Sequence, residues 1–304
     1  MTLAAVSSGK QAKAWRILLY GTEGVGKTTF ASQCPAPIFL GVEDGSAHLD
    51  VARFPSPQSW LEVREAVQQL IDGPHEYKTL VVDTVDAAEP LLWAHIVKRD
   101  TTSKQPLSSI EDYGYGKGYQ VALDEWRSFL AQLERLRERS VNVLLLGHSL
   151  LRTFKNPEGE DFDRYELKLH AKSAGLLKEW ADAVLFANYE TIASKDARTR
   201  RVRGVSTGVR LLHTVRTAAF DAKNRMNLPD SMVFDYAEFS SLLGGQSAAA
   251  LLEAIQAKAA GLSTDLREKV TAAISRANGS TEKLAQLNTW INAQASQPEA
   301  KKEN

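Results

Sequence analysis

The residues best suited to chemistry form one short stretch near the start of the chain. Its pattern, G-x-x-x-x-G-K-T, is that of a phosphate-binding loop. Glycines let backbone amides turn inward around a phosphate group, the lysine reaches the terminal phosphates, and the threonine hydroxyl binds Mg²⁺. The pattern therefore predicts a site for ATP and Mg²⁺, built from Gly21, Thr22, Glu23, Gly24, Val25, Gly26, Lys27, Thr28 and Thr29.

A carboxylate is expected beside the magnesium-binding threonine. Residues 79–82 form an apolar run typical of a buried strand, and Asp83 follows directly. We expect Asp83 and Thr28 to hold Mg²⁺ together, directly or through water. In many ATPases a glutamate comes next and activates water. This chain has Thr84 there, so the base must come from elsewhere.

Two further polar residues follow apolar strand patterns. Glu43 comes after residues 37–42, and His148 comes after residues 141–147. The carboxyl ends of parallel strands share one edge of a sheet, so both residues are expected near the phosphate loop. Glu43, with Asp44 as second choice, would orient a water in line with the γ-phosphate. His148 would sense the γ-phosphate, and a structural role at the strand end is the alternative.

A cationic pair lies much later in the sequence. Lys223 and Arg225 flank Asn224 at the end of a predicted ribbon. Such cations can reach the γ-phosphate bound by a neighbouring subunit and stabilise charge on it during transfer. A solvated turn is the other interpretation of this segment.

Strand-like and helix-like patterns alternate along most of the chain, which predicts an α/β fold with a mostly parallel central sheet. Helices are expected at residues 60–71, 87–98, 119–139 and 171–180, with polar loops at 100–118 and 151–168 and a ribbon at 188–225. Three helical patterns begin at residue 248. We expect an N-terminal extension (1–13), an ATPase core (14–245), a helical domain (246–296) and a disordered tail (297–304).

The composition of the chain limits its cellular location and its partners. Lys and Arg number 37 and so do Asp and Glu, so the chain as a whole is no polycation. One cysteine, Cys34, excludes a disulfide framework and fits a reducing compartment. The first fifteen residues lack the apolar run of a signal peptide, and no stretch is apolar enough to span a membrane. We therefore expect a cytoplasmic protein, in a bacterium or a phage-infected cell, without a membrane partner.

The order of these parts resembles the RecA-like core of recombinases. More narrowly, it is similar to the phage nucleotide-binding (AAA-type) family of P-loop ATPases, which includes phage single-strand annealing recombinases. The resemblance covers roughly residues 14–240. It rests on the phosphate loop, residues 42–45, residues 80–84, residues 147–149 and the Lys-Asn-Arg segment 223–225. It implies a RecA-like fold, ATP hydrolysis, a homo-oligomer with ATP between subunits, single-stranded DNA as partner and a single-strand binding protein as a further one.

No single surface is marked for DNA. The connector after His148 (151–172) holds equal numbers of basic and acidic residues, whereas residues 195–225 hold nine basic residues and two acidic ones. A tyrosine- and glycine-rich segment at 113–119 offers stacking groups on a flexible backbone. A solvated ribbon or a packed loop would explain these segments equally well. The DNA-contact candidates are Lys117, Arg152, Lys155, Arg198, Arg200, Arg201 and Arg203.

The sequence predicts an ATP-hydrolysing, DNA-stimulated protein acting in recombination or strand annealing. Two other classes stay open. One is a nucleotide-switched ATPase that binds a protein partner, and the other is a small-molecule kinase with residues 100–118 or 151–168 as a lid. A GTPase is excluded because no Asn-Lys-x-Asp base-reading motif occurs.

Overall fold

A computed structural model describes residues 13–43, 45–103, 106–195, 202–243 and 248–277, together with 283–284, 287–288 and 290–291. The chain divides into two compact units, Met1–Tyr236 and Ala237–Asn304. Asp44, Arg198, Arg200 and Arg201 lie outside the described residues, as do most of the predicted N-terminal extension and all of the predicted tail.

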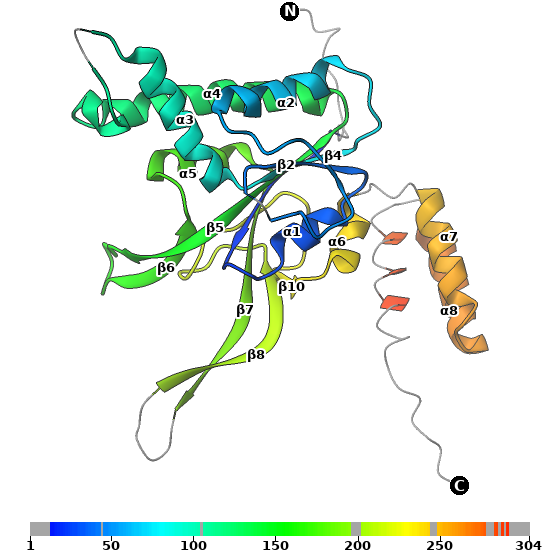
Figure 1. The fold of residues 1–304 in the computed structure, drawn as a ribbon. Coiled ribbons are helices and arrows are strands. Elements are labelled where there is room, and N and C mark those ends of the chain that lie inside the picture. Colours follow the sequence, from blue (N-terminus) through cyan, green and yellow to red (C-terminus); the bar gives the residue numbers. More distant parts are fainter. Residues whose placement is uncertain are drawn as a thin grey trace, which may run out of the picture. The chain divides into compact units, whose positions relative to one another are not determined.

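A mostly parallel sheet forms the centre of the first unit (Figure 1). Its strands lie in the order β10-β8-β7-β1-β5-β4-β2-β3. Neighbours from β7 to β3 run parallel, so the predicted α/β class with a mostly parallel sheet is confirmed. The parallel strands are β1 (Arg16–Gly21), β2 (Pro37–Gly41), β3 (Ala52–Arg53), β4 (Thr79–Asp83), β5 (Asn142–Phe154) and β7 (Ala183–Lys195).

Helices cover the sheet because their apolar stripes need a partner. In Figure 1, α2 (Trp60–Asp72), α3 (Val85–Asp100) and α4 (Lys117–Glu138) lie side by side over one face. Trp60 packs against Trp126 and Phe129, at ring-centroid distances of 5.4 and 5.0 Å. The structure also describes α1 (Lys27–Ser32), α5 (Ala171–Trp180) and a 3₁₀ turn at Ile110–Tyr113 in this unit.

Two antiparallel ribbons extend the sheet. In the first ribbon, β5 continues to Phe154 and pairs with β6 (Phe162–Leu167). The prediction of a polar loop at residues 151–168 was therefore wrong. Most side chains of this ribbon are exposed and few are apolar, so its composition resembles that of a loop. The second pairs β7 with β8 (Val202–His213), in the region where a ribbon was predicted. Two short strands, β9 (Lys223–Asn224) and β10 (Ser231–Val233), add to β7 and β8 respectively.

Helices dominate the second unit. α6 (Tyr236–Leu243) begins at the unit boundary, and α7 (Ala248–Ala259) and α8 (Thr264–Ala277) lie where helical patterns were predicted. Its small apolar core contains Ile255, Val270, Ala277, Leu284 and Ile291. Among the helices that the structure describes, none combines the length and apolar character that crossing a membrane requires.

Candidate nucleotide site

The phosphate loop connects the buried strand β1 to helix α1. Gly21 leaves no room for a side chain, because a Cβ there would lie 2.0 Å from the Ala187 carbonyl oxygen. Gly24 and Gly26 have φ values of 71° and 101°, which favour glycine. The sequence thus places glycine where a strand approaches closely and where the loop turns. The loop side chains of Glu23 and Thr29 are exposed.

Lys27 and Thr28 occupy the first turn of α1. The Lys27 ammonium donates to the carbonyls of Gly21 and Thr22, at 3.1 and 3.0 Å. Burial lowers the pKa of Lys27, against the pull of nearby carboxylates. These bonds hold the cation inside the loop, where phosphate oxygens would bind in a P-loop.

Thr28 and Asp83, the pair predicted to hold Mg²⁺, are in direct contact. The Thr28 hydroxyl donates to Asp83 Oδ2 at 2.9 Å, and Asp83 is buried at the carboxyl end of β4. Burial raises the pKa of Asp83 above its usual value. A hydroxyl and a carboxylate that converge in this way are hard oxygen ligands, which fit Mg²⁺. Bound there, Mg²⁺ would bring its charge to the phosphates.

Glu43 lies just beyond the end of β2. Gly41 is paired with Asp83 across the parallel strands, so β2 delivers Glu43 to the edge where Asp83 lies. The Thr84 hydroxyl donates to Glu43 Oε1 at 2.8 Å. The Glu43 side chain is 40% exposed, so water can reach it. The arrangement leaves a fixed carboxylate beside the phosphate loop, as a water-orienting group requires.

His148 lies at the same edge, because Gly21 of β1 is paired with it in β5. Its Nδ1 is 2.9 Å from Asp86 Oδ2 and 3.9 Å from Glu43 Oε1. Hydrogen bonding to Asp86 raises the pKa of His148, despite the opposing effect of burial. Glu43, Asp86 and His148 offer ligand atoms within 4.8 Å of one another, but His148 and Asp86 already pair with each other.

Three residues near the loop were missed by sequence reasoning. Asp86 contacts His148, the Arg210 guanidinium donates to the Val25 carbonyl at 3.2 Å, and the Tyr189 hydroxyl donates to the Gly24 carbonyl at 3.0 Å. Arg210 and Tyr189 reach the loop from β8 and β7, more than 160 residues away in sequence. These contacts exist because β7 lies beside β1 in the sheet, and local sequence patterns do not predict that strand order.

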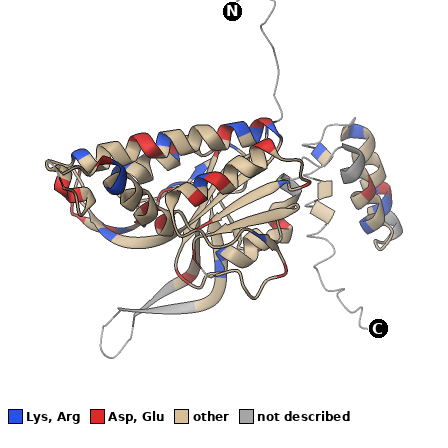
Figure 2. Ribbon diagram, turned by 45° about the horizontal axis from the view of Figure 1, so that its top comes forward, with Lys and Arg blue, Asp and Glu red and all other residues tan. Residues whose placement is uncertain are grey.

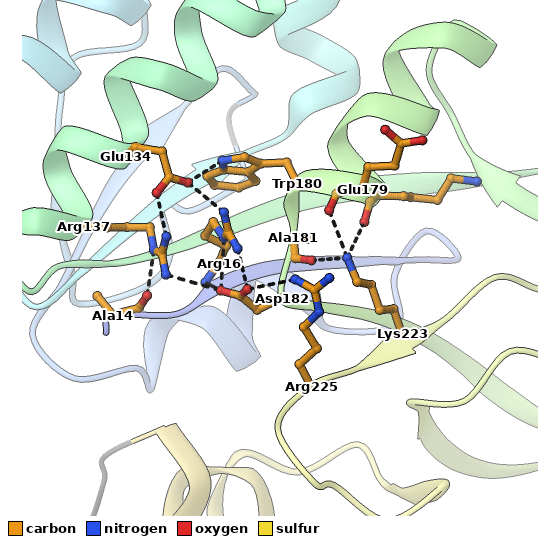
Figure 3. A network of polar contacts seen from close by, with 11 residues as sticks. Ala14, Arg16, Glu134, Arg137, Glu179, Trp180, Ala181, Asp182, Lys223 and Arg225 are labelled. Carbon is orange, nitrogen blue, oxygen red and sulfur yellow. Dashed lines mark hydrogen bonds and ion pairs between the residues drawn. The ribbon is translucent and has the colours of Figure 1, made fainter. Parts of the chain in front are cut away.

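Lys223 and Arg225 lie away from the phosphate loop of their own chain. Lys223 is paired with Val184 near the start of β7, whereas the loop follows Gly21, which is opposite Ala187. Figure 3 shows the Lys223 ammonium among the carbonyls that end α5, with donor distances of 3.2, 2.9 and 2.6 Å to residues 178, 179 and 181. Arg225 is 3.5 Å from the Asp182 carboxylate, and its side chain is 57% exposed.

The predicted DNA contacts are not brought together. Lys117 begins α4, Arg203 lies in β8, and Lys155 on the β5–β6 ribbon is paired with Asp161 at 2.5 Å. Arg152 lies 3.8 Å from Glu166. Figure 2 shows Lys and Arg interspersed with Asp and Glu over the helices. The helices in this view therefore carry charges of both signs rather than basic residues alone.

The aromatic residues considered for base stacking mostly pack internally. Phe154 packs on Phe162 at 5.2 Å, and Tyr165 packs on Phe186 at 5.1 Å. Tyr119 stacks on His170 at 4.0 Å. Tyr115 differs, since it is fully exposed with a φ of 48°. It is the aromatic of the 113–119 segment that remains available to a ligand.

The sequence matches the AAA_24 family, described as an AAA domain, over residues 13–226. It is similar to the SPbeta prophage-derived uncharacterized protein YorG of Bacillus subtilis (strain 168), with 23% identity over 153 residues, or 48% of this chain. The chain spans 44% of that relative's length. It is also similar to the crystal structure of the RadB recombinase, with a TM-score of 0.41, 14% identity, and coverage of 73% of this chain and 87% of that one. The family match includes every residue of the site described above, and the chain therefore belongs to this AAA-domain family of P-loop NTPases.

Proposed function

We propose that this protein is a RecA-like ATPase that acts on single-stranded DNA in phage or bacterial recombination or strand annealing. One observation carries the ATPase part. The Thr28–Asp83 pair, Glu43 and His148 all lie at the sheet edge that holds the phosphate loop. Four groups with complementary chemistry around one loop are what hydrolysis of a triphosphate needs.

Each group has a role in this proposal. Lys27 and the loop amides neutralise phosphate charge, and Thr28 with Asp83 holds Mg²⁺. Glu43 orients the attacking water, with its carboxylate held by Thr84. His148 contacts the γ-phosphate through the ring nitrogen that does not face Asp86. Phosphoryl transfer depends mainly on such positioning and charge stabilisation, so no covalent intermediate with the protein is required.

ATP lies between subunits in this proposal. Lys223 and Arg225 are near the amino end of β7, and the phosphate loop of the same chain is at the carboxyl end of β1. In this proposal these cations act on nucleotide held by another copy, and Arg225 is the stronger candidate because its side chain is 57% exposed. The proposal therefore requires a homo-oligomer in which each chain completes its neighbour's site.

DNA binding is supported by fewer observations. The β5–β6 ribbon starts at the strand that carries His148 and presents the exposed cations Arg152 and Lys155. The similarity to a prophage-derived relative supports the phage context of the proposal. The exposed Tyr115 offers an alternative contact, because aromatic rings stack on unpaired bases.

Phosphate release from ATP tests both parts. The wild-type protein should hydrolyse ATP with Mg²⁺, and Lys27→Ala should abolish turnover while the protein stays folded. Single-stranded DNA should raise the rate several-fold more than duplex DNA, and the stimulation should weaken steeply with salt. Unchanged turnover in Lys27→Ala would remove the site. Stimulation by a protein alone would favour a nucleotide switch, and a phosphorylated small molecule would favour a kinase.

A further inference from the structure

The segment from Asp83 to Asp86 joins β4 to α3 and contacts three other residues of the site, as follows. Asp83 faces Thr28, and Thr84 donates to Glu43. Asp86 faces His148. Nothing in the sequence pattern marks Asp86, because it belongs to no motif and lies three residues beyond the strand-ending carboxylate.

Asp86 holds His148 with both of its carboxylate oxygens. Oδ1 accepts from the His148 backbone amide at 2.9 Å, and Oδ2 lies 2.9 Å from the ring Nδ1. The Asp86 side chain is only 6% exposed, so these contacts are shielded from water. Burial alone would raise the pKa of Asp86, but its hydrogen bonds with His148 outweigh burial and lower that pKa.

These contacts fix the imidazole in one state. An ionised carboxylate only accepts hydrogen bonds, so Nδ1 must carry the proton that faces Asp86. The other ring nitrogen, Nε2, then points away from Asp86, with no hydrogen bond to any residue that the structure describes. An imidazole that is held at Nδ1 can present only Nε2 to a ligand.

Helix capping does not explain Asp86. Thr84 is the N-cap of α3, and its hydroxyl accepts from the Ala87 amide at 3.3 Å. Asp86 occupies the first turn, where a negative charge suits the helix dipole, yet both of its oxygens are used across the sheet edge on β5. A residue that only stabilised the helix would not need both contacts to one histidine.

We infer that Asp86 is a positioning residue for ATP hydrolysis, which holds His148 with Nδ1 protonated and Nε2 directed to the terminal phosphate. This inference rests on the proposed function. Asp86 touches neither nucleotide nor water in this scheme and acts only through His148. It adds to the site a residue that orients the sensor, as a carboxylate orients the histidine of a catalytic triad.

The first readout needs no turnover. At a pH high enough for the ring to be neutral, ¹⁵N NMR of the nucleotide-free protein should show the His148 imidazole protonated at Nδ1. The chain has six histidines, so His148→Gln assigns the signal. In Asp86→Asn the signal should move toward the Nε2-protonated form. An unchanged signal would show that Asp86 does not set the proton, and would overturn the inference.

The second readout is kinetic. Asp86→Asn should lower kcat about 10-fold or more and leave the Kd for MgATP within about twofold, because only the positioning of His148 is lost. In a His148→Gln background the same change should have no further effect. A full additional loss in that background would mean that Asp86 acts otherwise than through His148.

Glu89→Gln is the matched control. Glu89 is a buried carboxylate one turn further along α3, and it accepts from the His170 backbone amide at 2.9 Å without contacting His148. The Glu89→Gln variant should keep kcat near the wild-type value. A loss equal to that of Asp86→Asn would indicate general damage to α3 and would overturn the inference. Wild-type protein without ATPase activity would overturn the proposed function instead, and the NMR readout would still decide whether Asp86 orients His148.

Discussion

The Thr84 hydroxyl serves two neighbours at once. It donates to Glu43 Oε1 at 2.8 Å and accepts from the Ala87 amide at 3.3 Å. A hydroxyl can do both because it carries one proton and two lone pairs. In the sequence this position was notable only for lacking a glutamate. In the structure it connects the start of α3 to the carboxylate proposed to orient water.

Replacement of Thr84 by valine keeps the shape and removes the hydroxyl. We expect Thr84→Val to lose about 1 kcal/mol of folding stability as a missing N-cap. We also expect kcat to fall roughly 10- to 100-fold, because Glu43 is no longer held in place. Thr84→Ser retains the hydroxyl and should retain most of the activity. Steady-state ATPase assays and urea unfolding measure both effects, and equal kcat for the valine and serine variants would contradict the proposed role.

The phosphate loop depends on two glycines for different reasons. At Gly21 a Cβ would meet the backbone oxygen of Ala187, so β1 and β7 would have to separate. At Gly24 there is open space, but φ is +71°. Gly21→Ala should therefore cost about 3 kcal/mol and abolish ATP binding, and Gly24→Ala should cost only about 1 kcal/mol. Urea unfolding compares the stability of the two variants. Equal losses of stability would contradict the larger cost expected from the clash between Gly21→Ala and the Ala187 carbonyl.

A network of charged side chains joins β1, α4 and β7 at the amino end of the sheet (Figure 3). Arg16 pairs with Asp182 at 2.6 Å, with side-chain exposures of 20% and 11%. Burial alone would raise the pKa of Asp182, but the hydrogen bonds and charge of Arg16 outweigh it and lower this pKa. A lowered carboxyl pKa gives stability that is present above the unfolded value, about 3.9, and is lost as pH falls through the folded one.

Asp182→Asn should therefore cost about 2 kcal/mol at pH 7 and progressively less below about pH 4. The control is Asp124→Asn. Asp124 pairs with Arg127 at the same 2.6 Å, but the two side chains are 66% and 53% exposed. Asp124→Asn should lower the free energy of unfolding by about 0.5 kcal/mol or less. Urea unfolding of both variants and wild type at pH 7 and pH 3 provides the comparison. A difference from wild type that grows as pH falls would contradict the assignment.

Local patterns predicted the elements well where periodicity was strong. The helix expected at 60–71 is α2, and the one expected at 171–180 is α5 with the same bounds. The β5–β6 ribbon was not predicted, because its exposed residues lack the alternation of a half-buried strand. Asp86, Arg210 and Tyr189 escaped detection because their partners are distant in sequence and are set by strand order.

In the proposed function the site is complete only when two subunits meet. Mixing two inactive variants tests this, since Lys27→Ala removes the loop lysine and Arg225→Ala removes the exposed cation. If ATP lies between subunits, a one-to-one mixture should recover about a quarter of the wild-type rate, because random assembly pairs intact loops with intact cations at some interfaces. Activity no greater than the average of the separate variants would contradict the shared site. Arg225 is preferred to Lys223, whose contacts with the end of α5 give it a structural role.

MgATP binding is the property on which every other role depends. Isothermal titration calorimetry of the folded wild-type protein measures it most directly. We expect saturable heat corresponding to one nucleotide per chain, dependent on Mg²⁺ and absent in Lys27→Ala. No heat from wild-type protein whose circular dichroism shows an intact fold would contradict the nucleotide site, and with it the roles given to Glu43, Asp86 and His148.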